Sequence, residues 1–140
     1  MYTPVSARAA STYRQVGVES SIDGATPHQL VSLLFDGLMQ SLAEARGALA
    51  RDDIAAKGRH IGRAVRILEE GLKGGLNDAQ GGAVADNLRS LYDYCTVRLT
   101  YANLRNDDAG LAEVVELLAP VAQSWKQIGD TAGNATQGGI

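Results

Sequence analysis

The stretch from Asp86 to Asp107, DNLRSLYDYCTVRLTYANLRND, constrains the fold more than any other part of the chain. Apolar residues recur in it at spacings of three and four, which is the period of an α-helix and not of a strand. A chain organised around such a helix is expected to be a helical bundle. The face expected to meet the core comprises Val84, Leu88, Leu91, Tyr92, Cys95, Leu99 and Ala102.

A second apolar set projects from nearly the opposite side of the same predicted helix. We call it the outer row, and it consists of Tyr94, Val97, Tyr101 and Leu104. A helix with two apolar faces has a wider core, a homodimer seam, or a surface for another protein. A four-helix bundle needs one buried stripe per helix, and tyrosines are frequent anchors of binding surfaces. We therefore favour the binding surface.

Helix start and stop signals place three more helices. Thr26, Pro27 and Gln29 predict a capping box with proline in the first turn, opening a helix that reaches about Ala50. Either Asp52 or Asp53 can cap a second helix, which runs to about Lys73 and is stopped by two glycines. The segment LNDAQGG, from Leu76 to Gly82, predicts a turn. The last helix starts near Asp108 and ends near Gly129.

These elements define one domain. A chain of 140 residues with 45% hydrophobic content supplies a single core. Four helices with short connections are antiparallel to their neighbours, so we expect an all-α, antiparallel up-down-up-down four-helix bundle with a short N-terminal helical arm. Residues 1–25 are expected to be a flexible arm, 26–129 the bundle, and 130–140 a disordered glycine-rich tail.

The second helix carries two features besides its core stripe. Gly58 and Gly62 predict that another backbone comes close. On the side opposite its core stripe lie Arg59, Arg63, Arg66 and Lys73, which we interpret as a solvated face, with an RNA-binding surface as the alternative. The formal net charge of −3 and the isoelectric point near 5.3 argue against nucleic-acid binding.

No pattern predicts catalysis, a cofactor or a metal. His28 and His60 belong to no Glu-x-x-His pair, and the glycines match no phosphate-binding loop. Cys95 falls on the core face of its helix, where a small buried hydrophobe is expected. The N-terminus has no apolar signal segment and no run is long enough to span a membrane, so we expect a cytosolic protein without membrane insertion.

An ordered series of short motifs resembles a known family. The series is Tyr13, Ala25-Thr26-Pro27, LVSLLFDG from Leu30 to Gly37, LNDAQGG, Asn87-Leu88, LYDY from Leu91 to Tyr94, Ala102-Asn103 and Trp125. With these intervals, it is similar to the flagellar secretion chaperone family FliS over about residues 10–128.

The resemblance implies a function as well as a fold. Members are bacterial cytosolic helical bundles that bind the disordered C-terminal segment of flagellin, prevent its premature polymerisation and keep it competent for flagellar type III export. They consume no nucleotide. Besides flagellin, the flagellar export gate is an implied partner. The alternative function is a homodimeric structural or adaptor protein that uses the same apolar face against itself.

Periodicity and resemblance together give the expected site residues. The outer row is expected to form the main client floor, Phe35 and Met39 a neighbouring wall, and the Asn103 side-chain amide a partner for the client backbone. In the family, the N-terminal arm lies over part of the client groove and is displaced by flagellin. Carried over, the arm residues that compete for the groove are Val5, Ala9 and Tyr13.

Overall fold

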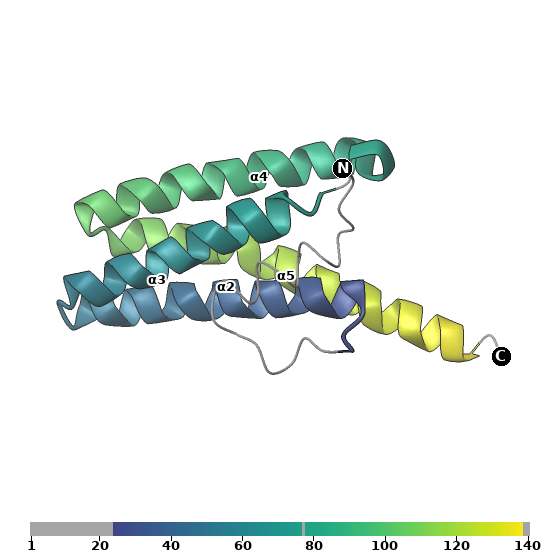
Figure 1. Cartoon of the computed structure of the whole chain (residues 1–140). Coiled ribbons are helices and arrows are strands. Elements are labelled where there is room, and N and C mark those ends of the chain that lie inside the picture. Colours follow the sequence, from purple (N-terminus) through teal and green to yellow (C-terminus); the bar gives the residue numbers. More distant parts are fainter. Residues whose placement is uncertain (1–23, 77, 139–140) are drawn as a thin grey trace.

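A computed structural model describes residues 24–76 and 78–138. Its elements, in order, are α2 (Pro27–Ala50), α3 (Ile54–Arg66), the π-helix η1 (Ile67–Lys73), α4 (Asp78–Arg105) and α5 (Asp108–Gly138). Figure 1 shows α3 and η1 as one continuous rod, so four antiparallel rods form the bundle. α4 lies across the bundle from α2, and α3 and α5 pack between them. The predicted all-α four-helix architecture is confirmed.

Side-chain caps fix the starts of the first two helices as predicted. The Gln29 amide donates to Thr26 Oγ1 at 3.1 Å, and the Thr26 amide donates to Gln29 Oε1 at 2.8 Å. Pro27 is the first residue of α2, where its missing N–H is not needed. Of the two candidate aspartates, Asp53 caps α3 by accepting from the Ala56 amide at 3.1 Å. These local signals made both boundaries predictable.

The core runs along the bundle axis and takes side chains from all four rods. Its largest fully buried side chains include Leu34, Leu38, Leu42, Ile61, Ile67, Leu68, Leu99, Leu111 and Leu118. Cys95 is fully buried among them, as expected. Val84, which was predicted to belong to the inner face of α4, is instead exposed, and so is the apolar Ile128 of α5. Both lie at the end of the bundle where α2 begins and η1 ends.

The π-helix was not predicted, and it explains one glycine. At the end of η1 the amide of the capping residue Gly74 donates to the carbonyl of Glu69, five residues back, at 3.1 Å. The Glu70 carbonyl is thereby left against Gly74, where an added Cβ would lie 2.5 Å from it. Gly74 is therefore required by the wide turn as well as by the helix end. The predicted close approach at Gly62 is wrong, since a Cβ there would meet nothing within 4 Å.

The turn into α4 agrees with the sequence, but α5 is longer than expected. One helical turn precedes Gly82, whose φ of 52° and ψ of −128° are accessible to glycine and break the rod. α5 continues through Pro120 to Gly138, so residues 130–138 are helical where we expected a disordered tail. They contain no proline, and extending a helix is easier than starting one. Figure 1 shows this end of α5 projecting beyond the bundle.

Two further predictions concern membrane insertion and the N-terminal arm. None of the helices in residues 24–76 and 78–138 combines the length and the apolar character that crossing a membrane requires. The arm residues Val5, Ala9 and Tyr13 lie outside the described residues.

Candidate binding surface

The outer row lies on the solvent side of α4. Exposed fractions are 48% for Tyr94, 55% for Val97, 49% for Tyr101 and 76% for Leu104. The opposite side of the same helix is buried, with Cys95 and Leu99 at 0% exposure. A wider core is therefore excluded as the explanation of the second apolar face. Four large apolar side chains remain open over about ten residues of one helix, which is the property expected of a binding surface.

Polar contacts with α5 hold one end of the outer row. The Tyr94 hydroxyl donates to a Glu113 carboxylate oxygen, and Arg98 Nε donates to the other at 2.8 Å. The bond to Glu113 raises the pKa of Tyr94, and the bonds from Tyr94 and Arg98 lower the pKa of Glu113. Tyr94 thus keeps its proton and Glu113 its charge at neutral pH. The Tyr94 ring is held in position at the α4–α5 seam.

Asn103, expected to pair with a client backbone, is already engaged inside the bundle. Lys57 Nζ donates to Asn103 Oδ1 at 2.7 Å and to the Asn103 carbonyl at 2.8 Å. The residue Lys57 is only 3% exposed. The last carbonyls of a helix lack intrahelical donors, so this ammonium completes the end of α4. The Asn103 oxygens therefore serve as structural contacts. Pairing of its side-chain NH2 group with a client backbone stays a prediction.

Phe35 and Met39 do not form a wall beside the outer row. Both come from α2, which lies across the bundle from α4. Phe35 is 2% exposed, and Met39 is half-buried and packs against the core. Periodicity shows that a helix face is apolar, but it cannot show which helix that face will meet. The structure therefore separates these two residues from the outer row.

Phe35 instead belongs to a pocket that was not predicted. This end pocket has a volume of about 640 Å³ and opens where α2 begins and η1 ends. Gly71, Gly75 and Gly81 are among its lining residues. Its apolar lining includes Val31, Phe35, Leu72, Val84, Leu88, Tyr92, Val121, Trp125 and Ile128. One signal in the sequence could have indicated this pocket. Apolar positions such as Val84 and Ile128 continue a helical stripe beyond the point where the adjacent helices end.

Contacts between Trp125 and the start of α2 define one wall of the end pocket. The Trp125 indole stacks on the His28 ring with centroids 4.5 Å apart, and Nε1 donates to the His28 carbonyl at 3.1 Å. Elsewhere in the lining, burial raises the pKa of Tyr92 to about 12, so its hydroxyl stays neutral. The end pocket is therefore apolar and uncharged within.

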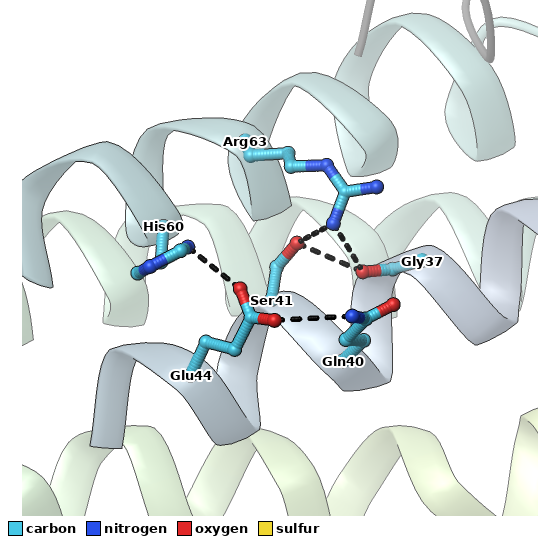
Figure 2. Close-up of polar contacts among 6 residues, drawn as sticks. All are labelled: Gly37, Gln40, Ser41, Glu44, His60 and Arg63. Atoms are coloured by element: carbon cyan, nitrogen blue, oxygen red, sulfur yellow. Dashed lines mark hydrogen bonds and ion pairs between the residues drawn. The ribbon is translucent and has the colours of Figure 1, made fainter. Parts of the chain in front are cut away.

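The four predicted basic residues of α3 and η1 do not form one continuous row. Figure 2 shows Arg63 reaching back to α2, where Nη1 donates to Ser41 Oγ at 2.8 Å. Lys73 turns toward α4 and contacts Asp93 at 2.6 Å and Glu69 at 3.6 Å. Arg59 and Arg66 alone are exposed. An extended electrostatic surface on this helix is not present.

The polar contacts drawn in Figure 2 hold α2 and α3 together. Ser41 is fully buried, and its hydroxyl donates to the Gly37 carbonyl at 2.8 Å while accepting from Arg63. One turn away, His60 Nδ1 lies 3.0 Å from Glu44. These contacts join α2 to α3 and satisfy the buried hydroxyl.

The single cysteine of the chain is buried and protonated. Burial raises the pKa of Cys95 to about 11, so its thiol stays protonated. In the part of the chain that the structure describes, no group of three or more His, Cys, Asp or Glu side chains could hold a metal ion.

Comparisons with known proteins agree with the motif series. The sequence model of a protein family described as "Flagellar protein FliS" matches residues 9–132. The chain is 46% identical to the flagellar secretion chaperone FliS of Salmonella typhimurium over 94% of this chain and 96% of that protein. It is 42% identical to the flagellar secretion chaperone FliSB of Pseudomonas aeruginosa, over 86% and 95% respectively. With the Escherichia coli protein FliS it shares 36% identity over 86% of this chain and 89% of that one.

Proposed function

Because the chain belongs to the FliS family of flagellar secretion chaperones and is a flagellar export chaperone, we propose that its client is flagellin and that the client docks on the outer row. One observation carries the proposal. Tyr94, Val97, Tyr101 and Leu104 are exposed on a helix whose other side already supplies the core. The second face of this helix is therefore open to another chain.

The chemistry of the outer row suits a segment that folds as it binds. A disordered tail can form an amphipathic helix on an apolar row, since i, i+3 and i+7 anchors match the spacing of the row. Burial of apolar surface favours the complex, and the entropy lost when the tail orders opposes it. The complex therefore stays releasable. Release without a chemical step suits a chaperone that hands its client to an export apparatus, and we propose no catalysis.

The cellular role follows from which part of flagellin is covered. We propose that this protein acts in the bacterial cytosol, holding the C-terminal segment of newly made flagellin before export. A covered segment cannot pair with other subunits, so premature polymerisation is prevented. The same cover keeps the client unfolded and competent for flagellar type III secretion. The export gate is the partner expected to receive the complex.

We further propose that the N-terminal arm competes with the client through Val5, Ala9 and Tyr13. The described chain begins at Gly24, and α2 starts at the rim of the end pocket, which Val31 lines. A tether of 23 residues spans up to roughly 75 Å, so an apolar arm attached at that rim can reach the outer row at a high effective concentration. The arm would shield apolar surface in the free protein and yield it to flagellin.

Removing residues 1–23 is therefore expected to strengthen client binding by about fivefold, because the client no longer displaces a tethered competitor. The truncation keeps Gly24 and the Thr26 cap, so α2 should start unchanged. Titration of flagellin C-terminal peptide into the full-length and truncated proteins measures the difference. Unchanged or weaker binding by the truncated protein would argue against a competing arm.

Tyr101→Asp tests the docking surface itself. It places a charge in the middle of the apolar contact, and we expect affinity to fall by about tenfold, or roughly 1.4 kcal/mol. Isothermal titration calorimetry with the C-terminal segment of flagellin from the same bacterium measures the loss. The wild-type complex should show a strongly negative heat-capacity change and additional helical circular dichroism.

Tyr101→Phe is the matched control. The Tyr101 hydroxyl has no hydrogen-bond partner among the residues that the structure describes, so its removal should leave affinity within about twofold. Both variants should keep the helical content of the wild type, because the side chain is half-exposed. Equal affinities for the aspartate and phenylalanine variants would show that the client lies elsewhere.

A homodimer is the second candidate function, and the same exposed row supports it. Two copies could pack their outer rows against each other. Sedimentation of the purified protein distinguishes the two functions. A dimer that persists at saturating flagellin peptide would favour the structural role, and a monomer that forms a complex with the peptide would favour the chaperone.

A further inference from the structure

A cation lies directly on the outer row. Arg105 is the last residue of α4, and its guanidinium carbon lies 5.4 Å from the centroid of the Tyr101 ring. The side chain is exposed. No carboxylate within residues 24–76 or 78–138 forms an ion pair with it. Arg105 is thus placed against an apolar anchor without a counter-charge in the described chain.

The nearby carboxylates are engaged with other arginines. Asp108 receives two bonds from Arg46, at 2.9 Å and 3.0 Å. Asp107 lies 3.6 Å from Arg98, which also donates to Glu113. Both aspartates at the α4–α5 turn are therefore paired with other arginines, and neither pairs with Arg105. A cation at a helix C-terminus is favourable by itself, but that does not explain the position over Tyr101.

The contact with the Tyr101 ring uses none of the N–H donors of Arg105 as hydrogen bonds. A guanidinium is planar, and its N–H groups point outward in its own plane. The edge that they form matches a carboxylate with two parallel hydrogen bonds. The ring contact also reduces the rotamer freedom that the long side chain would lose on binding. Arg105 can therefore bind an anionic group beside the outer row at a reduced cost in side-chain entropy.

We propose that Arg105 binds a carboxylate of the client segment and so sets which segments the outer row accepts. This inference rests on the proposed function, since it assigns a specificity residue to the same surface. A client that places its apolar side chains on Tyr101 and Leu104 would bring its carboxylate to the exposed edge of the guanidinium. The carboxylate is supplied by an aspartate or glutamate side chain or by the terminal α-carboxylate.

The experiment measures affinities of wild type and Arg105→Gln for the flagellin C-terminal segment and for altered forms of it. In one form the terminal carboxylate is amidated, and in the others single Asp or Glu residues become Asn or Gln. We expect Arg105→Gln to weaken binding of the unaltered segment by about fivefold, the size of a good surface ion pair. For the one altered segment that lacks the carboxylate bound by Arg105, the wild type and Arg105→Gln should have equal affinities. The identity of that segment names the source of the carboxylate.

Two further variants separate charge pairing from other effects. Arg66→Gln makes the same charge change at an exposed arginine of α3, and it should leave affinity unchanged. Arg105→Lys keeps the charge without the planar fork, so it should restore only part of the affinity and retain a dependence on salt. Helical circular dichroism and thermal unfolding of the full chain confirm that each variant is folded.

Three outcomes would overturn the inference. Arg105→Gln could bind as the wild type does, or Arg66→Gln could weaken binding equally, or the loss at Arg105 could be the same for every altered segment. An equal loss for every altered segment would mean that Arg105 contributes only its packing on Tyr101 and pairs with no client carboxylate. If Tyr101→Asp still weakens binding in these cases, the docking surface stands and the specificity role fails. If Tyr101→Asp is also without effect, the proposed docking surface itself has failed.

Discussion

Replacing Val97 and Tyr101 together with aspartate is expected to weaken flagellin binding by at least about a hundredfold, or roughly 2.7 kcal/mol. The two side chains are one helical turn apart near the middle of the outer row and are each about half-exposed. Burying such an apolar side chain contributes roughly 1.5 to 3 kcal/mol, and a carboxylate in the contact adds a desolvation cost. Calorimetry with the C-terminal segment measures the change.

The double variant Asn87→Asp with Ser90→Asp is the matched control. It adds the same two charges at exposed polar positions of α4, earlier on the same helix. Affinity should fall by less than about threefold, because no apolar contact is lost and surface charges interact weakly. A comparable loss in the two double variants would mean that net charge, and not the outer row, determines binding.

Replacing Lys57 with alanine is expected to lower the free energy of unfolding by roughly 3 kcal/mol. The substitution removes a buried aliphatic chain and leaves two Asn103 oxygens without their donor. It also removes the contact that completes the C-terminal end of α4, the end that carries Tyr101 and Leu104. Denaturant unfolding followed by circular dichroism measures the stability.

Lys57→Met separates the ammonium from its aliphatic chain. Methionine fills much of the same volume but cannot donate, so we expect about 1 to 2 kcal/mol of the loss to remain. A glutamine variant at the exposed Arg59, two residues on, should change stability by less than about 0.5 kcal/mol. If the methionine variant were as stable as the wild type, the contact with Asn103 would contribute nothing to the fold.

The sequence predicted what local rules control. The Thr26 cap, an aspartate cap at residue 52 or 53 and most of the buried face of α4 follow from hydrogen-bonding chemistry and a 3.6-residue period, and the structure has them. The same period places the outer row on the side of the helix opposite its core face. That side is exposed because only one face of the helix packs against the core. The π-helix has no such rule, because its wide turn depends on packing around Ile67 to Lys73.

Long-range pairings were beyond the sequence. Lys57 and Asn103 are separated by 46 residues, and only the packing of α3 on α4 brings them together. Phe35 was assigned to the client wall because periodicity shows that a face is apolar but not which helix it meets. The end pocket was missed for a related reason: Val84 and Ile128 continue their core stripes past the point where neighbouring helices cover them.

The most direct test of the account is nuclear magnetic resonance of the methyl groups as flagellin C-terminal segment is added. We expect the Val97 and Leu104 methyl signals to shift strongly and to show contacts with client protons. The buried Leu68 methyl groups serve as the reference and should barely move. Client contacts confined to the end-pocket methyl groups of Val84, Val121 and Ile128, with Val97 and Leu104 unchanged, would contradict docking on the outer row.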